Sequence, residues 1–343
     1  MAVDTQDARR PIEPELAEFA TLAQAAGARI LETVVQKRAR VDPATLLGSG
    51  KAREIAERVA AIDAQLVLVF NDLRPRQRKN LESIIAVPIV DRTMLILDVF
   101  ARQARSREGK LQVELAQLRY RQSNLIGAGA DLSRLGGGIG TRGPGETKLE
   151  VDRRRIGTRI AALNRQLEAV RAQRATRRGP WSGEPLVALV GYTNVGKSSL
   201  LNRLAKSDAL VADRPFATLD PTVRSVYLSP NAKIRLVDTV GFITDLPKDL
   251  VNAFRATLEE LQQADALIHV IDASNPDWPR QAAAVDQTLI DLHLEQKPRV
   301  IVFNKSDAAD DIAHEPGALY VSAHTGSGLE ALRARLANLR HIE

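Results

Sequence analysis

The sequence of 343 residues contains no cysteine. This absence excludes disulfide bridges, cysteine-ligated metal sites and thiol catalysis, and it fits a cytoplasmic location. Aromatic residues make up only 4% of the chain. No apolar run approaches the roughly 18 residues that a membrane helix needs, so we expect neither export nor membrane insertion.

What the chain does contain is typical of a globular protein, with 44% hydrophobic and 26% charged residues. Its length exceeds the roughly 100 to 200 residues of one domain, which predicts two or three domains. Residues 1–180 hold 32 Lys and Arg against 21 Asp and Glu, whereas the rest hold 16 against 21. A basic N-terminal half predicts a polyanionic partner, although a solvated surface of ion pairs explains the charge equally well.

The first region, residues 1–105, alternates strand-like and helix-like patterns. Aliphatic runs at residues 30–36, 66–70 and 86–90 are separated by helical periodicity at residues 51–62 and 76–85. This alternation predicts a small parallel α/β domain over about residues 22–100.

The second region, residues 106–178, has two long helical patterns at residues 108–125 and 146–174. The second pattern carries a heptad seam of Leu149, Ile156, Ile160, Leu163, Leu167 and Val170. We therefore predict an antiparallel helical hairpin. The glycine-rich connection, residues 126–145, is either a flexible linker, which composition favours, or a probe whose bare backbone lies close to a partner.

The third region, residues 184–343, has strand patterns at residues 186–190, 223–228, 234–237, 266–271, 299–303 and 319–321. Helical segments separate them. Six strands with intervening helices predict an α/β fold with a doubly wound sheet.

A phosphate-loop pattern, G-x-x-x-x-G-K-S, directly follows the first of these strands. Glycines let backbone N–H groups converge on phosphates, Lys197 supplies positive charge, and the Ser198 hydroxyl is a ligand for Mg²⁺. A glycine turn entering a helix is the alternative, but the strand, loop and helix context favours the phosphate loop. The residues expected around the phosphates are Gly191, Tyr192, Thr193, Asn194, Val195, Gly196, Lys197, Ser198 and Ser199.

Residues near the C-terminus indicate which nucleotide base the site prefers. An Asp307 carboxylate can accept bonds from N1–H and the exocyclic amine of guanine, whereas adenine has no donor at N1. This predicts GTP and GDP as ligands. The residues expected around guanine are Asn304, Lys305, Ser306, Asp307, Ser322, Ala323 and His324.

Two further segments are expected near the γ-phosphate and Mg²⁺. The first contains Asp238, Thr239, Val240, Gly241 and Phe242. The second contains Phe216, Ala217, Thr218, Leu219 and Asp220. We expect Thr218 to be the second protein ligand of Mg²⁺, with Thr222 as its rival, and we assign catalytic roles to Lys197, Thr218 and Gly241. Phe242 cannot orient an attacking water, which predicts slow intrinsic hydrolysis.

Several stretches resemble the HflX family of translational GTPases over nearly the whole chain. They are residues 47–51, 71–80, 108–117, 216–220 and, most specifically, GGGIGTRGPGETKLE at residues 136–150. The resemblance implies an N-terminal α/β domain, a helical hairpin and a G domain. It also implies binding to rRNA of the large ribosomal subunit and GTP-dependent splitting or rescue of stalled ribosomes under stress.

Some features leave alternatives open. A factor that matures precursor large subunits, or a regulatory switch that binds a protein effector, would fit the same motifs. Many family members carry a further domain after the G domain, so its contacts are not expected here, and Asn124 departs from the common hairpin sequence. Residues 47–51 could hold an anion at a helix start, but a second nucleotide site is less favoured there than a simple helix-start turn or an rRNA phosphate contact. We expect a monomer.

Overall fold

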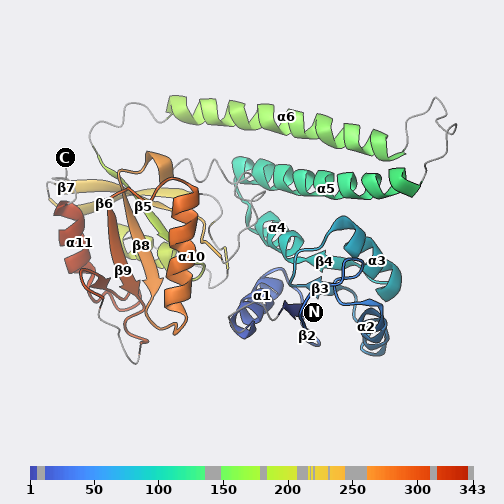
Figure 1. Ribbon diagram of the computed structural model, residues 1–343. Helices are drawn as coiled ribbons and strands as arrows, with labels where there is room; N and C mark the ends of the chain where they lie inside the picture. Colours follow the sequence, from blue (N-terminus) through green and yellow to red (C-terminus); the bar gives the residue numbers. More distant parts are fainter. Residues whose placement is uncertain are drawn as a thin grey trace. The chain divides into compact units, whose positions relative to one another are not determined.

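The computed structural model describes residues 1–5, 12–135, 148–177, 184–206, 215–216, 218, 221–230, 232–243, 261–309 and 315–338. It divides into two compact units (Figure 1). Unit 1 comprises residues 1–102 and 111–169, and unit 2 comprises residues 103–110 and 170–343. The boundaries expected for three domains, at residues 1–105, 106–178 and 184–343, remain a prediction.

Unit 1 contains two small parallel sheets. Strand β1 (Ala2–Thr5) pairs with β2 (Val35–Arg38), and β3 (Val67–Val69) pairs with β4 (Ile89–Asp91). The parallel α/β prediction is therefore confirmed, but this part of the chain begins at β1 and not near residue 22. The strand expected from residue 30 starts only at Val35, because its register is set by β1, with Ala2 opposite Val35.

Four helices surround these strands: α1 (Glu13–Ala25), α2 (Ser49–Ala61), α3 (Pro75–Ile85) and α4 (Arg92–Gln103). The patterns at residues 51–62 and 76–85 predicted α2 and α3, whereas α1 and α4 were not predicted. Helix α3 begins where Pro75 fixes the backbone and Gln77 Oε1 accepts the Arg74 N–H at 3.0 Å. Buried aliphatic side chains from β1, α2, β3 and α3 share one core.

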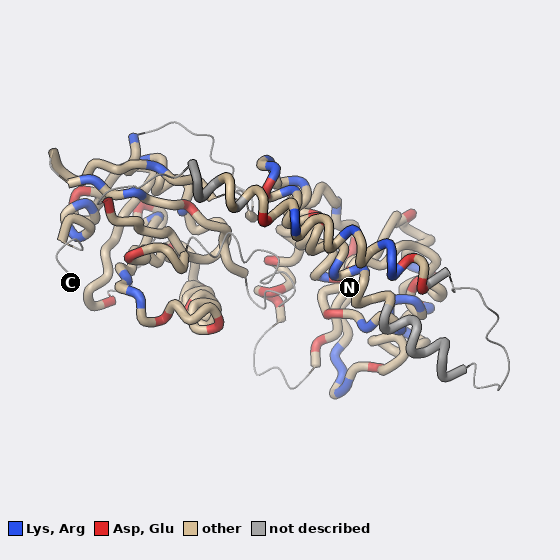
Figure 2. Tube along the Cα trace, turned by 90° about the horizontal axis from the view of Figure 1, so that it is seen from above, with Lys and Arg blue, Asp and Glu red and all other residues tan. Residues whose placement is uncertain are grey.

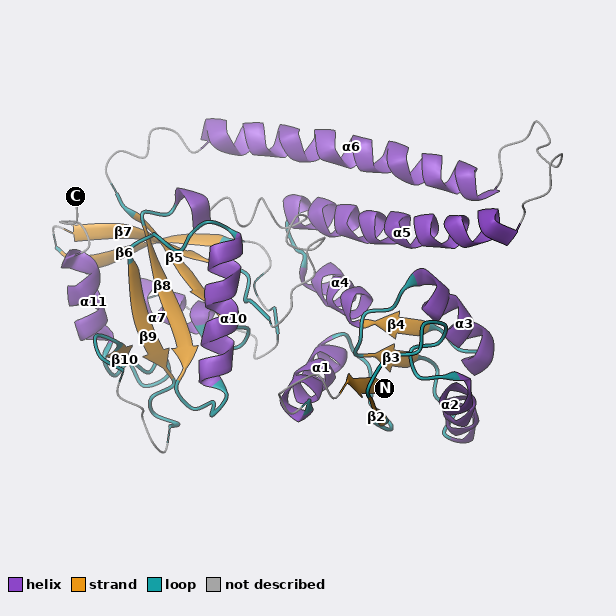
Figure 3. Cartoon of the chain, in the orientation of Figure 1, coloured by secondary structure: helices purple, strands orange, loops and turns teal. Residues whose placement is uncertain are grey.

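The hairpin consists of α5 (Arg107–Leu135) and α6 (Lys148–Arg177), which run side by side (Figure 3). Arg159 of α6 and Glu114 of α5 form an ion pair at 2.7 Å. Leu163 and Leu167 of the predicted seam are buried, as expected. The expected loop from residue 126 was wrong in part, because helix α5 continues to Leu135. Residues 136–145 of that loop lie outside the described residues.

The α5 extension has a simple cause. An isolated glycine in a helix costs only about 1 kcal/mol relative to alanine. Between residues 126 and 135 the two glycines alternate with alanines and precede leucines, so good helix formers outnumber them. Local glycine content therefore did not decide where the helix ends.

Unit 2 has a six-stranded sheet in the order β10-β9-β8-β5-β7-β6. All neighbours are parallel except β6 and β7. The strands are β5 (Leu186–Gly191), β6 (Thr222–Ser229), β7 (Ala232–Asp238), β8 (Ala266–Asp272), β9 (Arg299–Asn304) and β10 (Leu319–Tyr320). All six predicted strands are confirmed. The described helices of this sheet are α7 (Lys197–Ala205), α10 (Trp278–Asp291) and α11 (Leu329–Asn338).

The strand order changes direction around β5, which lies between β7 and β8. In open α/β sheets, ligands bind beyond the carboxyl ends of the strands at such a switch point. The segments that follow β5, β7, β8 and β9 are therefore the place to look for a site. Among the described residues, no helix is long and apolar enough to cross a membrane.

Candidate nucleotide-binding site

The loop between β5 and α7 needs glycine at both ends. Gly191 has φ +154°, and a Cβ there would lie 2.3 Å from the carbonyl oxygen of Val270. Gly196 has φ +89°, and its Cβ would lie 2.3 Å from Asn304 Nδ2. A side chain at Gly191 would collide with β8 and one at Gly196 with Asn304 at the end of β9, so close approach explains the glycines.

Lys197 begins α7 and is buried at 6% exposure. Its Nζ donates to the carbonyl oxygens of Gly191 at 3.1 Å and Tyr192 at 2.7 Å. Burial lowers the pKa of Lys197 to about 8, while the nearby Asp238 carboxylate acts in the opposite direction. The ammonium group is therefore held inside the loop that the sequence assigned to phosphate. Ser199 lies in the first turn of α7.

Three oxygen-bearing side chains meet beside Lys197. Asp238 Oδ2 accepts from Ser198 Oγ at 2.6 Å and from Thr218 Oγ1 at 2.9 Å, and the two hydroxyls are 2.8 Å apart. Asp238 ends β7 and is 2% exposed, and this burial raises the pKa of its carboxyl against the opposing effect of Ser198. Asp238 Oδ1 is buried with no hydrogen-bond partner among the described residues.

Thr222, the rival to Thr218, does not join this cluster. It begins β6, opposite Asp238 in the strand register, and its side chain is exposed. Phe216 is buried at 2% exposure with φ +57°. Ala217, Leu219 and Asp220 lie outside the described residues.

The segment after β7 packs on the phosphate loop. Phe242 N donates to Gly191 O at 3.1 Å, and Thr193 N donates to Phe242 O at 2.8 Å. A Cβ on Gly241 would lie 2.8 Å from Thr193 Cα, so the segment has no room for a side chain there. The Phe242 ring is buried at 3% exposure, and Thr239 Oγ1 donates to Leu189 O at 2.6 Å. Val240 lies between these anchors.

The segment after β9 is joined to the phosphate loop by Asn304. Its Nδ2 donates to Val195 O at 2.9 Å, and its Oδ1 accepts the Ala323 N–H at 3.0 Å. Ser306 N donates to Val321 O at 3.2 Å. The residues assigned to phosphate and those assigned to guanine are therefore parts of one hydrogen-bonded assembly.

Asp307 lies at the exposed end of this assembly. A hydrogen bond from Ser322 holds the pKa of its carboxyl below the usual value, and His324 contributes less, with Nδ1 at 3.6 Å from Asp307 Oδ2. The carboxylate is therefore ionised at neutral pH and ready to accept hydrogen bonds. The His324 side chain is 89% exposed, and Asp307 is its ion-pair partner in the part of the chain that the structure describes.

One residue of the site was not anticipated from the sequence. Lys305 Nζ forms an ion pair with Asp272 Oδ2 at 2.6 Å, and Asp272 is the last residue of β8. This pair anchors the Lys305 side chain at the carboxyl end of β8. Its position in the sequence could have identified Asp272 as a site residue. It is a carboxylate at the carboxyl end of a buried parallel strand, where ligand-binding residues gather.

Comparison with known families agrees with this geometry. Three family models match the chain in succession: "GTP-binding GTPase N-terminal" at residues 13–101, "GTP-binding GTPase Middle Region" at residues 103–180 and "50S ribosome-binding GTPase" at residues 186–305. GTPase HflX of Caldanaerobacter subterraneus subsp. tengcongensis is 49% identical over 93% of this chain and 76% of its own. GTPase HflX of Escherichia coli is 43% identical over 94% of this chain and 79% of its own.

The chain belongs to the HflX family of GTPases. The resemblance seen in the sequence is thereby confirmed, and so is the conclusion that the protein is a GTP hydrolase with a ribosome-binding GTPase domain. A crystal structure of SsGBP in complex with GDP is also similar, at 24% identity and a TM-score of 0.51, covering 99% of this HflX chain and 97% of that chain. At this identity the likeness supports the fold only.

Proposed function

We propose that this HflX protein binds Mg²⁺ and GTP at the carboxyl edge of the unit 2 sheet and hydrolyses GTP faster on the large ribosomal subunit. We further propose that it acts in the splitting or rescue of stalled ribosomes under stress. The observation that carries the nucleotide part is the convergence of Lys197, Ser198, Thr218 and Asp238 within hydrogen-bonding or Coulombic reach.

The oxygen cluster fits a magnesium ion. Mg²⁺ prefers hard oxygen ligands and takes only one or two from protein when phosphates and water supply the rest. Ser198 and Thr218 offer hydroxyl oxygens, and Asp238 Oδ1, which has no hydrogen-bond partner in the described part of the chain, can orient a bound water. When bound, the ion neutralises charge on the β- and γ-phosphates.

Side chains and backbone groups of this chain bind the phosphates and the guanine base. The Lys197 ammonium, released from the carbonyls of Gly191 and Tyr192, balances phosphate charge as the γ-phosphoryl group leaves. We assign the Gly241 N–H to a γ-phosphate oxygen, and the close packing of Gly241 on Thr193 and near Lys197 Nζ supports this assignment. Asp307 accepts two hydrogen bonds from guanine, and Lys305 covers the base plane.

Phe242 accounts for the slow GTP hydrolysis that we expect in the absence of ribosomes. Its buried ring has no polar atom with which to orient water. We infer that a ribosomal contact supplies the missing group or orders the segments around Thr218. The arginine content of the hairpin supports an RNA partner: α6 is rich in basic residues (Figure 2), and five arginines in its first two thirds are exposed. They are Arg153, Arg154, Arg155, Arg159 and Arg165.

GTP turnover with and without purified large subunits tests the proposal. We expect turnover well below about one per second alone and a stimulation of at least tenfold by large subunits, with small subunits as the matched control. Equal stimulation by both subunits, or tens of turnovers per second without either, would contradict it. Sedimentation of intact ribosomes with the protein and GTP then tests splitting.

Two other readings give different results in the same assays. A maturation factor would be stimulated by precursor large subunits more than by mature ones. A switch for a protein effector would bind without the steep loss of affinity that rising salt causes in phosphate contacts.

A further inference from the structure

A cavity of about 490 Å³ lies in unit 1, whereas the nucleotide site belongs to unit 2. Its walls come from α3 and α4 of the α/β part and from both helices of the hairpin, α5 and α6. Its volume is within the range of about 300 to 1,000 Å³ that is usual for small-molecule sites. Nothing in the GTPase reaction uses it.

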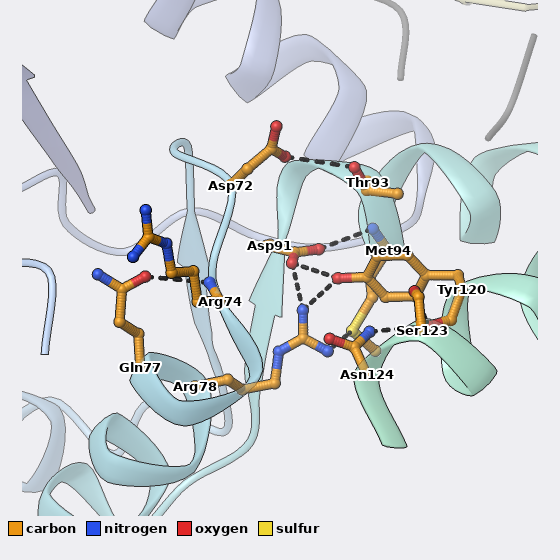
Figure 4. Close-up of polar contacts among 10 residues, drawn as sticks. All are labelled: Asp72, Arg74, Gln77, Arg78, Asp91, Thr93, Met94, Tyr120, Ser123 and Asn124. Carbon is orange, nitrogen blue, oxygen red and sulfur yellow. Dashed lines mark hydrogen bonds and ion pairs between the residues drawn. The ribbon is translucent and has the colours of Figure 1, made fainter. Parts of the chain in front are cut away.

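Arg78 lines the cavity, and its guanidinium is held by the polar contacts drawn in Figure 4. Arg78 Nη2 bonds both Asp91 Oδ2 and the Tyr120 hydroxyl, and Tyr120 also donates to Asp91. The guanidinium lies 5.4 Å from the centre of the Tyr120 ring, and Nη1 contacts Met94 Sδ at 3.0 Å. Arg78 therefore presents a rigid planar surface, and its buried Nε has no partner among the described residues.

The mouth of the cavity carries two unengaged arginines. Arg121 and Arg155 are exposed and form no hydrogen bond or ion pair with any described residue. Asp98 and Asp152 also line the cavity. Burial raises the pKa of Asp98, which Arg102 and Arg121 oppose. A ligand that reaches the mouth therefore meets donors for an anion and carboxylates that accept hydrogen bonds.

The charges nearly cancel. Three arginines line the cavity, and Asp91, Asp98 and Asp152 offset them when ionised. A polyphosphate would need a surplus of positive charge, which this site lacks. A single phosphate at the mouth is matched by Arg121 and Arg155.

The interior suits a flat, partly apolar group. Leu97 is buried, and Met94, Leu125 and Ile156 are half-buried around the space. The amides of Gln117 and Asn124 add donors and acceptors at the edge. Unpaired bases are recognised by this combination of a guanidinium or aromatic plane, apolar contacts and hydrogen bonds to base edges.

We propose that this cavity binds one nucleoside monophosphate unit, with the base inside against Arg78 and the phosphate at Arg121 and Arg155. Asp98 and Asp152 accept hydrogen bonds from an exocyclic amine, so cytidine and adenosine bind better than uridine, which has none. The unit is either a free mononucleotide or an unpaired nucleotide of an RNA strand. The proposal that the ligand belongs to an RNA strand rests on the proposed ribosomal function, whereas the proposal of a mononucleotide site does not.

The test uses the full chain with its G domain saturated with GDP and Mg²⁺. Anisotropy of fluorescent cytidine, adenosine and uridine hexanucleotides and calorimetry with CMP, AMP and UMP measure binding. We expect cytidine and adenosine probes to bind about fivefold or more tightly than uridine probes. Comparable binding by CMP and the cytidine hexanucleotide identifies a free nucleotide as the source, and binding by the hexanucleotide alone identifies RNA.

Matched variants separate the cavity from general basic charge. Arg155→Glu should weaken binding at least about tenfold, whereas Arg153→Glu, an exposed neighbour on α6 outside the cavity, should weaken it less than about threefold. Ile156→Trp, which fills the space, should abolish saturable binding, with circular dichroism confirming that each variant is folded. Equal losses in the two arginine variants, or no saturable binding of any probe, would overturn the proposal. Ribosome-stimulated GTP hydrolysis by the wild type would survive that result, so the two proposals fail separately.

Discussion

Asn304 and Val195, 109 residues apart in the chain, are joined by a hydrogen bond of 2.9 Å from the Asn304 amide to the Val195 carbonyl. The other end of the amide accepts the N–H of Ala323. One buried side chain thus holds together the phosphate loop, the segment after β9 and the segment after β10. The three parts of the nucleotide site are consequently positioned relative to one another before any ligand arrives.

Asn304→Ala should lower the affinity for GTP and the affinity for GDP to a similar extent. Leaving buried backbone groups unpaired costs about 1 to 3 kcal/mol, which corresponds to roughly 5- to 150-fold in affinity. Titration with fluorescent GDP and GTP measures this loss of affinity. Asn71→Ala is the matched control, because Asn71 makes the same pair of amide bonds to the Val3 backbone in unit 1. A loss in the control as large as that in Asn304→Ala would refute the coupling.

Asp307→Asn should exchange the base preference. An amide in place of the carboxylate can no longer accept both donors of guanine, and sites built on such bonds discriminate by about 10⁴-fold. Xanthine has a carbonyl where guanine has its amine, so the asparagine amide can donate to it. We expect GTP affinity to fall and XTP affinity to rise. Unchanged GTP binding would remove Asp307 from the site.

Thr218→Ala and Thr222→Ala distinguish the two candidate magnesium ligands. Thr218 contacts Ser198 and Asp238, whereas Thr222 is exposed at the start of β6. We expect Thr218→Ala to raise the Mg²⁺ concentration for half-maximal hydrolysis by about tenfold or more, and Thr222→Ala to leave it nearly unchanged. GDP affinity should stay the same in both variants. The reverse order of effects would favour Thr222.

Sequence patterns predicted most of the nucleotide site but little of unit 1's polar structure. Gly191, Lys197 and Asp238 could be placed because carboxyl ends of parallel strands meet at one edge, so strand patterns fix their proximity. The Lys305–Asp272 pair depends on which strands are neighbours in the sheet, and local sequence patterns do not predict the strand order. Helix α4 was missed because its aliphatic run, residues 95–97, has no strict periodicity from which helix and strand can be distinguished.

The network of Arg78, Asp91 and Tyr120 illustrates a second limit. Its members come from α3, the end of β4 and α5, and no motif links them. Asp91 is 1% exposed, so its charge has to be compensated wherever the fold permits. Such pairing is set by tertiary packing, which a single sequence does not reveal.

Tyr120→Phe should destabilise unit 1 by about 1 to 3 kcal/mol, because Asp91 and Arg78 lose a buried hydroxyl partner. Arg78→Met, which removes the ion-pair partner of the buried Asp91 carboxylate, should cost about 3 to 5 kcal/mol. Urea unfolding followed by circular dichroism measures both. Tyr227→Phe is the control, since Tyr227 is 64% exposed on β6 and should change stability by less than about 0.5 kcal/mol. Equal effects of the two tyrosine variants would contradict a stabilising role for the network.

Nucleotide affinity should fall as the pH rises from 7 to 8.5. The phosphates require protonated Lys197, and burial lowers the pKa of that ammonium in the free protein to about 8. Below this pKa the charge is present, and above it binding must first restore the proton, so the dissociation constant should rise about fourfold over this range. The range stops short of the pH at which guanine loses its own N1 proton. Calorimetry in two buffers of different ionisation enthalpy should detect uptake of more than about half a proton at pH 8.5. A flat affinity profile without proton uptake would mean that Lys197 stays charged throughout and that the negative charge of Asp238 outweighs the effect of burial on the pKa of Lys197.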